Sequence, residues 1–210
     1  MTSFLHRVAF VLVLSVGALT ALGARPAAAG QPSDQLKAQI DRVLKVLEDP
    51  ELKKEAKVKD RRRAVRKIAN EIFDFAETAR RSLGRHWHAR TPAERDEFVQ
   101  LFSDLLERSY ISRVELYGGE KIQYLGDSFE GDQAKVQTKL LTKSGSEIPI
   151  EYRMHRKSER WLVYDVSIEG VSLIANYRTQ FNKIIQTSSY QELVKKMKTK
   201  QEELATGQQS

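Results

Sequence analysis

Metal binding is the first chemistry to consider, because two histidines lie close together in the chain. His86 and His88 flank Trp87, and the other histidines are His6 and His155. A zinc site usually takes about four ligands, drawn mainly from cysteine and histidine, and the chain contains no cysteine. We therefore expect no metal site, and we expect Trp87 to pack at a helix connection with its neighbouring histidines at the surface.

Nucleophilic catalysis has one weak candidate, Ser172. It follows Gly170 by two residues, as in a nucleophile elbow, but Ile174 stands where the second glycine of that motif belongs. Without that glycine the motif is incomplete. We therefore interpret Ser172 as the cap of the helix that follows it.

Two carboxylates, Asp165 and Glu169, share one face of a predicted strand and could form an acid–base pair. Four residues of extended chain separate them by about 13 Å, which is too far for the carboxylate pair of a glycosidase. Salt bridges to Arg153 or Arg178 are the expected role instead. The sequence thus predicts no catalytic residues, and it gives no reason to expect a cofactor.

The first thirty residues have the layout of a secretory signal peptide: a positive start, an apolar stretch over 8–22 and the small residues Ala27–Ala29. The apolar stretch is short for a membrane span, which needs about 20 residues; an uncleaved anchor is the alternative. We expect residues 1–29 to be removed, which takes away Arg7 and Arg25 and lowers the net charge from +7 to +5. The absence of cysteine excludes an acylated-cysteine anchor and any disulfide.

Apolar residues recur at helical spacing in five segments of the exported part. These predicted helices cover 36–47, 65–83, 91–106, 173–184 and 190–197. The third has the clearest start, because Thr91 caps it, Pro92 takes the first helical position and Glu94 completes a capping box. From Lys198 the sequence is polar, so we expect one domain over 30–197 and a fraying tail over 198–210.

Strict alternation of apolar and polar residues predicts four strands between the third and fourth helices. The alternating segments are 121–124, 135–140, 148–155 and 162–169, with turn residues at Gly126-Asp127, Gly131-Asp132, Ser144-Gly145 and Lys157-Ser158. Short connections of this kind are typical of an antiparallel meander with one apolar and one polar face. The predicted fold is α+β, with helices packed on one side of a four-stranded antiparallel sheet.

A strongly basic segment precedes the second helix and continues into it. Residues 53–67 hold nine lysines or arginines against two acids, and no aromatic residues interleave with them. An exported protein meets little nucleic acid, so we do not expect a nucleic-acid partner. A solvated helix face is one interpretation. The other is contact with anionic headgroups or an acidic partner through Arg62, Arg63, Arg66 and Lys67.

Several segments, in their order along the chain, together resemble a known family. They are Phe73-Asp74-Phe75, Leu83 to Trp87, Thr91 to Phe98, Leu105-Leu106, Ser109-Tyr110, Ile148 to Arg153, Trp161 to Val166 and Ile168 to Phe181. The ordered set is similar to the MlaC family of periplasmic lipid-transport proteins, the toluene-tolerance auxiliary components of an ABC transport system. The resemblance runs from about residue 36 to residue 197, and no single short motif in it is diagnostic.

The resemblance implies a helix-and-sheet fold enclosing a deep apolar cavity for phospholipid acyl chains. It also implies a periplasmic shuttle between an outer-membrane lipoprotein complex and an inner-membrane ABC transporter. A related branch occurs beside hopanoid biosynthesis, so a hopanoid or another polycyclic lipid is the alternative cargo. An isomerase-like enzyme on a similar fold is a further alternative, but His155 and Asp165 alternate away from the predicted apolar strand face.

Helix period and strand parity select apolar side chains that could line one pocket, although periodicity alone also allows an ordinary core. The predicted lipid-binding residues are Phe73, Phe98, Phe102, Leu105, Tyr110, Val136, Leu140, Ile150, Tyr152, Tyr164 and Val166.

Overall fold

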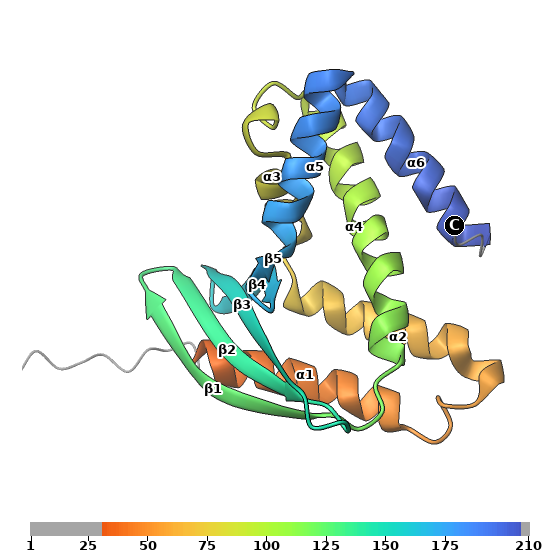
Figure 1. The fold of residues 1–210 in the computed structure, drawn as a ribbon, viewed down its shortest axis with the longest axis vertical. Helices are drawn as coiled ribbons and strands as arrows, with labels where there is room; N and C mark the ends of the chain where they lie inside the picture. The colour runs from red at the N-terminus through yellow and green to blue at the C-terminus, as the bar shows by residue number, and fades with distance from the viewer. Residues whose placement is uncertain (1–30, 207–210) are drawn as a thin grey trace, which may run out of the picture.

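The computed structural model describes residues 31–206, and the predicted leader lies outside the described residues (Figure 1). The helices are α1 (Pro32–Glu48), α2 (Val58–Ile72), α3 (Phe75–Leu83), α4 (Pro92–Glu115), α5 (Leu173–Thr187) and α6 (Tyr190–Thr206), with 3-10 turns η1 (Glu55–Lys57) and η2 (Gly84–His86). The strands are β1 (Lys121–Glu130), β2 (Gln133–Leu141), β3 (Glu147–Lys157), β4 (Arg160–Ile168) and β5 (Val171–Ser172). The predicted α+β class is confirmed. In the part of the chain described, no helix combines the length and apolar composition needed to cross a membrane.

The strands form one antiparallel sheet in the order β1-β2-β3-β4-β5. The fifth strand, which the sequence pattern does not predict, pairs with the end of β4 through Val171 and Ile168. The predicted turn at Gly126-Asp127 is wrong, because β1 continues through it with a bulge after Tyr124. Gly126 has φ +145° there, a conformation that glycine adopts without strain.

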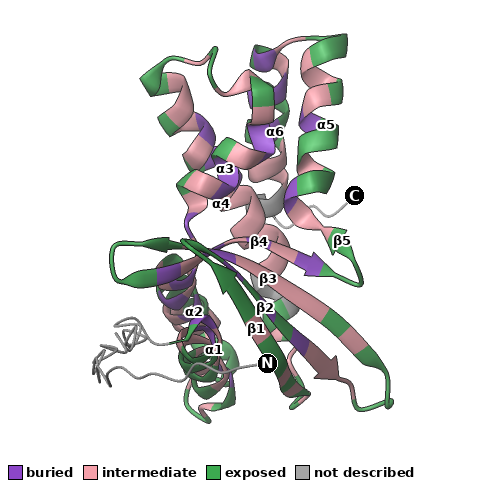
Figure 2. Ribbon diagram, turned by 90° about the vertical axis from the view of Figure 1, so that its left-hand side faces the viewer, coloured by how far each residue is buried: buried purple, intermediate pink, exposed green. Residues whose placement is uncertain are grey.

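One face of the sheet, here called the inner face, packs against α1 and α2 (Figure 2). Its buried side chains form a single cluster with those of the two helices: Leu36, Ile68, Ile72, Ala134, Val136, Met154, Trp161 and Val163. Burying each of the larger aliphatic side chains contributes about 1.5–3 kcal/mol of transfer free energy. This cluster holds the sheet and the first two helices together as one body.

Helices α3 to α6 form a second layer beyond the β4 edge of the sheet, and in Figure 1 the lower end of α4 reaches α2. Their cluster is built around Phe98 and Phe102, which are 0% and 1% exposed. The Phe181 ring meets both edge-on, with ring centroids 5.7 and 5.3 Å away. The protein therefore has two apolar cores, and only α1 and α2 cover a face of the sheet as predicted.

The predicted helix over 65–83 is interrupted at Phe73 and Asp74, which separate α2 from α3. Phe73 is extended and forms a parallel bridge with Val163, and the Asp74 backbone N–H donates to the Val163 carbonyl at 2.9 Å. The Asp74 carboxylate then caps α3 by accepting from the Glu77 backbone N–H at 3.0 Å. Pairing with the edge of β4 thus replaces one turn of helix.

Helix α6 continues to Thr206, so the tail expected to fray from Lys198 is helical over its first nine residues. Polar contacts to α4 account for the difference. Lys198 pairs with Glu97 at 2.7 Å, and the Gln201 amide donates to Asp104. An apolar pattern does not report such contacts.

Candidate functional site

The strand register aligns side chains in rows across the inner face. One row crosses all five strands: Tyr124, Thr138, Ile150, Ile168 and Val171. The next row consists of Ile122, Leu140 and Ile148.

Six aliphatic members of these two rows are here called the apolar strip: Ile122, Leu140, Ile148, Ile150, Ile168 and Val171. Four of the six are half-buried, whereas Ile168 and Val171 are 36% and 58% exposed. Helices α1 and α2 bury the neighbouring rows at Met154 and Val136 to 1% or less exposure. The helices therefore leave the strip only partly covered, most of all at Ile168 and Val171.

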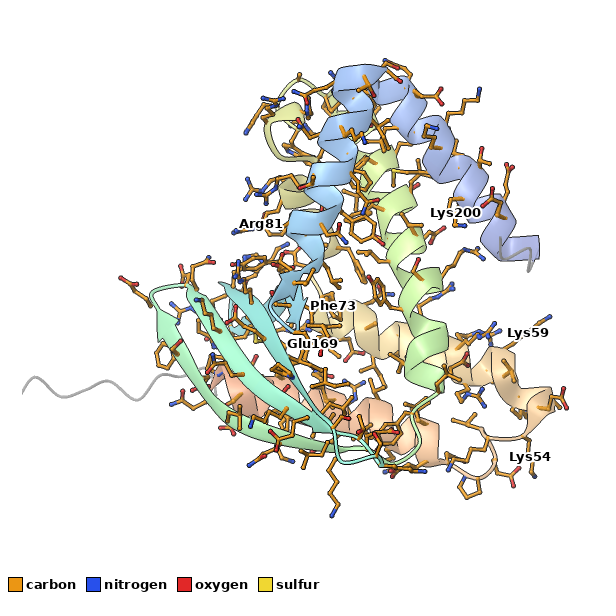
Figure 3. All side chains as sticks on the ribbon, viewed as in Figure 1. Lys54, Lys59, Phe73, Arg81, Glu169 and Lys200 are labelled. Atoms are coloured by element: carbon orange, nitrogen blue, oxygen red, sulfur yellow. The ribbon has the colours of Figure 1, made fainter. Side chains whose placement is uncertain are left out.

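Five predicted lipid-binding residues do share the inner face: Val136, Leu140, Ile150, Tyr152 and Val166. Phe73 packs against the same cluster from the end of α2, where Figure 3 shows it beside the sheet. Val136 is 0% exposed and serves as core, while the other five are half-buried. The structure brings these six side chains together at one surface.

Tyr164 lies on the opposite face, so its assignment to the pocket is corrected. A bulge between β3 and β4 pairs Met154 with Val163 but Arg153 with Asp165, which leaves Tyr164 as the extra residue. Its ring packs edge-on against His155 at 5.9 Å, and the Arg81 guanidinium lies 3.9 Å from its centroid. One inserted residue reverses the strand parity on which the prediction rests.

Phe98 and Phe102 are also corrected, because they lie in the core of the second layer and offer no surface to a ligand. Leu105 is half-buried and packs against that same core. Tyr110 is half-buried further along α4. Helical period correctly predicts that these residues face inward, but it does not say which core they enter.

Two tyrosines make the inner face less uniformly apolar than the sequence suggests. Burial raises the pKa of the Tyr152 hydroxyl, and the Thr138 side chain opposes this by hydrogen bonding to it. Burial also raises the pKa of Tyr124, with smaller contributions from Tyr152 and Asp41. The Tyr124 hydroxyl is buried without any hydrogen-bond partner.

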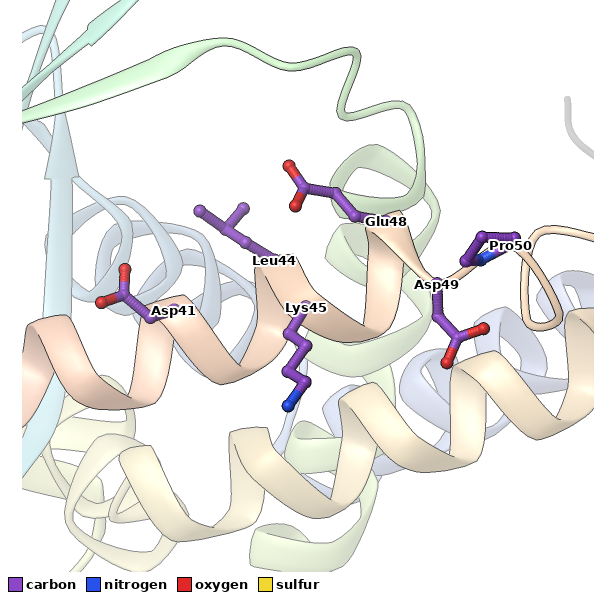
Figure 4. Close-up of a pocket in the computed structure, with 6 residues that line it drawn as sticks. All are labelled: Asp41, Leu44, Lys45, Glu48, Asp49 and Pro50. Atoms are coloured by element: carbon purple, nitrogen blue, oxygen red, sulfur yellow. The ribbon is translucent and has the colours of Figure 1, made fainter.

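Two surface grooves border α1, and neither is lined by a predicted site residue. Figure 4 shows the larger, of about 510 Å³, which is lined by Asp41, Leu44, Lys45, Glu48, Asp49 and Pro50. The smaller, of about 240 Å³, lies between α1, the end of α2 and Trp161. The first is open and rich in carboxylates, so neither its shape nor its charge suits an acyl chain.

The four predicted headgroup or partner contacts are exposed, as expected, but they divide into two pairs. Arg62 binds Glu115 at 2.9 Å, and Arg66 binds Glu107, so both connect α2 to α4. Arg63 only approaches Asp60 of its own helix, at 3.8 Å. Arg63 and Lys67 are thus the cations of this set that project without tying two helices together.

His86 and Ser172 form polar contacts within the fold. His86 Nε2 lies 3.0 Å from Asn182 Oδ1, and Ser172 accepts from the Ala175 backbone N–H as the predicted cap of α5. Ser172 also donates to Asp165 at 2.6 Å, and Arg153 approaches that carboxylate at 4.0 Å. Over residues 31–206, no three histidine, aspartate or glutamate side chains gather as a metal site would require.

Asp74 is a buried carboxylate to which the sequence analysis assigns no role. Its Oδ2 accepts from Lys157 at 3.0 Å and lies 3.2 Å from His155 Nε2. Burial opposes ionisation, but the Glu77 backbone N–H and Lys157 together hold the pKa of Asp74 below its usual value. Because the Asp74 carboxylate oxygens are held by contacts within the fold, we interpret the cluster as a joint between β3, β4 and α3 and not as a reactive site.

Comparison with known proteins identifies the family to which this sequence belongs. The family model described as MlaC protein matches residues 37–199, most of the chain. The chain belongs to the MlaC family. This confirms the resemblance carried by the ordered segments.

Two known proteins are similar to the chain. The intermembrane phospholipid transport system binding protein MlaC of Haemophilus influenzae is 25% identical over 120 residues, which are 55% of this chain and 56% of that protein. The match thus spans little more than half of that relative's length. The solved structure of the phospholipid-binding protein from Ralstonia solanacearum, in complex with a phospholipid, has a TM-score of 0.73 at 24% identity. The structural alignment covers 83% of this chain and 99% of that protein, and it shows that the two proteins share a fold.

Proposed function

We propose that the protein is a periplasmic phospholipid carrier that binds acyl chains against the apolar strip of the inner face. It shuttles its cargo between an outer-membrane lipoprotein complex and an inner-membrane ABC transporter, as the MlaC family implies. The names of both relatives refer to phospholipid binding or transport and support this cargo. The role is that of a carrier, not of an enzyme.

The observation that carries the proposal is the apolar strip itself. Aliphatic side chains from all five strands stand in register, and the outermost, Ile168 and Val171, remain 36% and 58% exposed. A contiguous exposed apolar surface is typical of a binding site. Acyl chains lying along the strip would remove both the protein's and the lipid's apolar surface from water.

The energetics suit a carrier. Burying about 30 methylene groups removes about 24 kcal/mol of unfavourable water contact, at about 0.8 kcal/mol each. Escape of the lipid into buffer is therefore negligible. Transfer from a bilayer to the protein exchanges one apolar environment for another, so the direction of transport depends on the partners.

The test is native mass spectrometry and lipid extraction on protein purified without detergent. We expect a stoichiometric adduct with the mass of a phospholipid. A polycyclic lipid in its place would keep the carrier role and change the cargo. Protein that carries no lipid, and takes up none from vesicles, would refute the proposal.

A pair of matched variants locates the site. Ile150→Trp fills space on the strip and should lower lipid occupancy several-fold in a folded protein. The control is Gln137→Trp, an exposed position on the opposite face of β2. Equal loss of lipid in both variants would show that the strip is not the binding surface.

A further inference from the structure

The Tyr124 hydroxyl is the one polar group of the inner face that the fold leaves without a partner among the described side chains. Its oxygen is buried and makes no hydrogen bond, in contrast to Tyr152, which has Thr138 beside it. A buried hydroxyl that lacks a hydrogen-bond partner destabilises the folded state. Such a group is uncommon in a folded protein and calls for an explanation.

None of the described groups around Tyr124 forms a hydrogen bond with its hydroxyl. Asp41 of α1 is near enough to affect it electrostatically, but its carboxylate accepts from Lys37 at 2.7 Å and not from Tyr124. Thr138, its direct partner across the β1–β2 ladder, donates to the Ile150 carbonyl at 3.4 Å. The Tyr124 hydroxyl therefore keeps its donor unused.

The position of Tyr124 indicates what could use this donor. It begins the row that continues through Thr138 and Ile150 to the exposed end of the apolar strip at Ile168 and Val171. A molecule that lies along the strip and inserts beneath α1 would reach the Tyr124 end of this row, where Tyr124 packs against the cluster of α1 and α2. Tyrosine combines an apolar ring, suited to packing on acyl chains, with a hydroxyl that can donate one hydrogen bond.

We propose that the Tyr124 hydroxyl donates a hydrogen bond to an oxygen atom of the bound lipid and thereby selects oxygen-bearing chains. In a phospholipid this acceptor is an ester carbonyl. In a polycyclic alcohol it is the hydroxyl oxygen. The inference rests on the proposed carrier function and adds a specificity-determining residue to it.

The experiment is a competition read by native mass spectrometry. Lipid-free protein is equilibrated with vesicles containing equal amounts of a diester phosphatidylglycerol and the diether phosphatidylglycerol of the same chain length. The diether has the same headgroup and hydrocarbon but lacks both carbonyls. Wild type should carry the diester in about fivefold excess, as one neutral hydrogen bond gives, and Tyr124→Phe should carry both equally.

The matched control is Tyr190→Phe, in the core of α3 to α6, whose hydroxyl donates to the Glu94 carbonyl at 2.9 Å. It should keep the diester preference. Thermal unfolding without lipid separates the two variants further. Tyr124→Phe should unfold at the same temperature as wild type or higher, because it removes a buried unpaired group, whereas Tyr190→Phe should unfold at a lower temperature, because it loses the bond to Glu94.

A second arm distinguishes the source of the acceptor. It repeats the competition with a sterol and the same ring system lacking its hydroxyl. If wild type prefers the sterol in this arm but shows no preference for the diester in the first, and Tyr124→Phe loses the preference for the sterol, the donor role stands. The acceptor is then the hydroxyl of a polycyclic alcohol. Equal binding of both members in both arms by wild type would overturn the inference and leave the carrier intact. A preference that survives in Tyr124→Phe would also overturn it. Wild type that binds none of the four lipids would refute the carrier function itself.

Discussion

Replacing Asp74 should show how firmly the two layers of the protein are joined. Its Oδ1 caps α3 through the Glu77 backbone N–H, and its Oδ2 binds Lys157 and His155 of β3. Loss of an N-cap costs about 1 kcal/mol. The Lys157 side chain is 62% exposed, so its pairing contributes only about 1 kcal/mol or less.

These magnitudes predict a graded series. Asp74→Ala loses both contributions and should lower the free energy of unfolding by about 2 kcal/mol. Asp74→Asn keeps a good capping oxygen and loses the charge, so it should lose about half as much. The control is Asp132→Ala, which breaks an exposed pair with Arg156 and should change stability little.

The effect of Asp74 should also depend on pH. Because the pKa of Asp74 is lowered in the folded state, its ionised form contributes stability above the unfolded pKa of about 3.9. That contribution is lost as the pH falls through the folded pKa, so wild type and Asp74→Asn should converge in acid. Urea unfolding followed by circular dichroism measures each difference. Equal stability of Asp74→Ala and wild type at neutral pH would refute the reasoning.

Three further predictions concern other parts of the molecule. Arg80 and, to a lesser extent, Arg81 lower the pKa of Glu77 to about 2, so the contribution of Glu77 to stability should be lost from pH 4.5 downward. Unfolding curves of Glu77→Gln should therefore show a smaller fall in stability over this range than those of wild type. Reversing Arg63 and Lys67 to glutamate should leave the melting temperature unchanged and slow transfer to anionic vesicles several-fold at low salt. Reversing Arg62 and Arg66 should instead lower the melting temperature, because each new carboxylate would face Glu115 or Glu107; equal melting of both double variants would contradict this. Val136→Trp should destabilise the fold by about 1–3 kcal/mol through overpacking of a 0% exposed site, and a wild-type unfolding midpoint for this variant would show that the inner face holds spare volume there.

Local chemistry alone predicted much of the architecture. The capping box of α4 forms as expected, with Thr91 and Glu94 bonding each other's backbone N–H groups at 2.8 and 3.2 Å. Ser172 caps α5 with its hydroxyl oxygen, as predicted. Such signals are readable because donor and acceptor lie three residues apart, and the alternation of the strands is equally local.

The sequence also determined family membership, through segments spread over most of the chain. It predicted the inner-face positions of Val136, Ile150 and Tyr152 from strand parity, and the register confirms them. It indicated a single apolar interior, however. Periodicity predicts that a side chain is buried, but it does not predict which other side chains it packs against. For that reason Phe98 and Val136 were predicted to share a pocket, whereas Phe98 lies in the core of α3 to α6 and Val136 in the core of the inner face.

Only the tertiary structure decided the features that depend on residues far apart in the chain. Pairing of Phe73 with Val163 breaks a helix that local propensity would continue, and the bulge at Tyr164 turns that ring to the opposite face. The unused hydroxyl of Tyr124 is likewise visible only once the register and the packing of α1 are known. The physical reason is common to all three: hydrogen bonding and burial across the sheet outweigh local preferences, and their partners are set by the fold and not by spacing along the sequence.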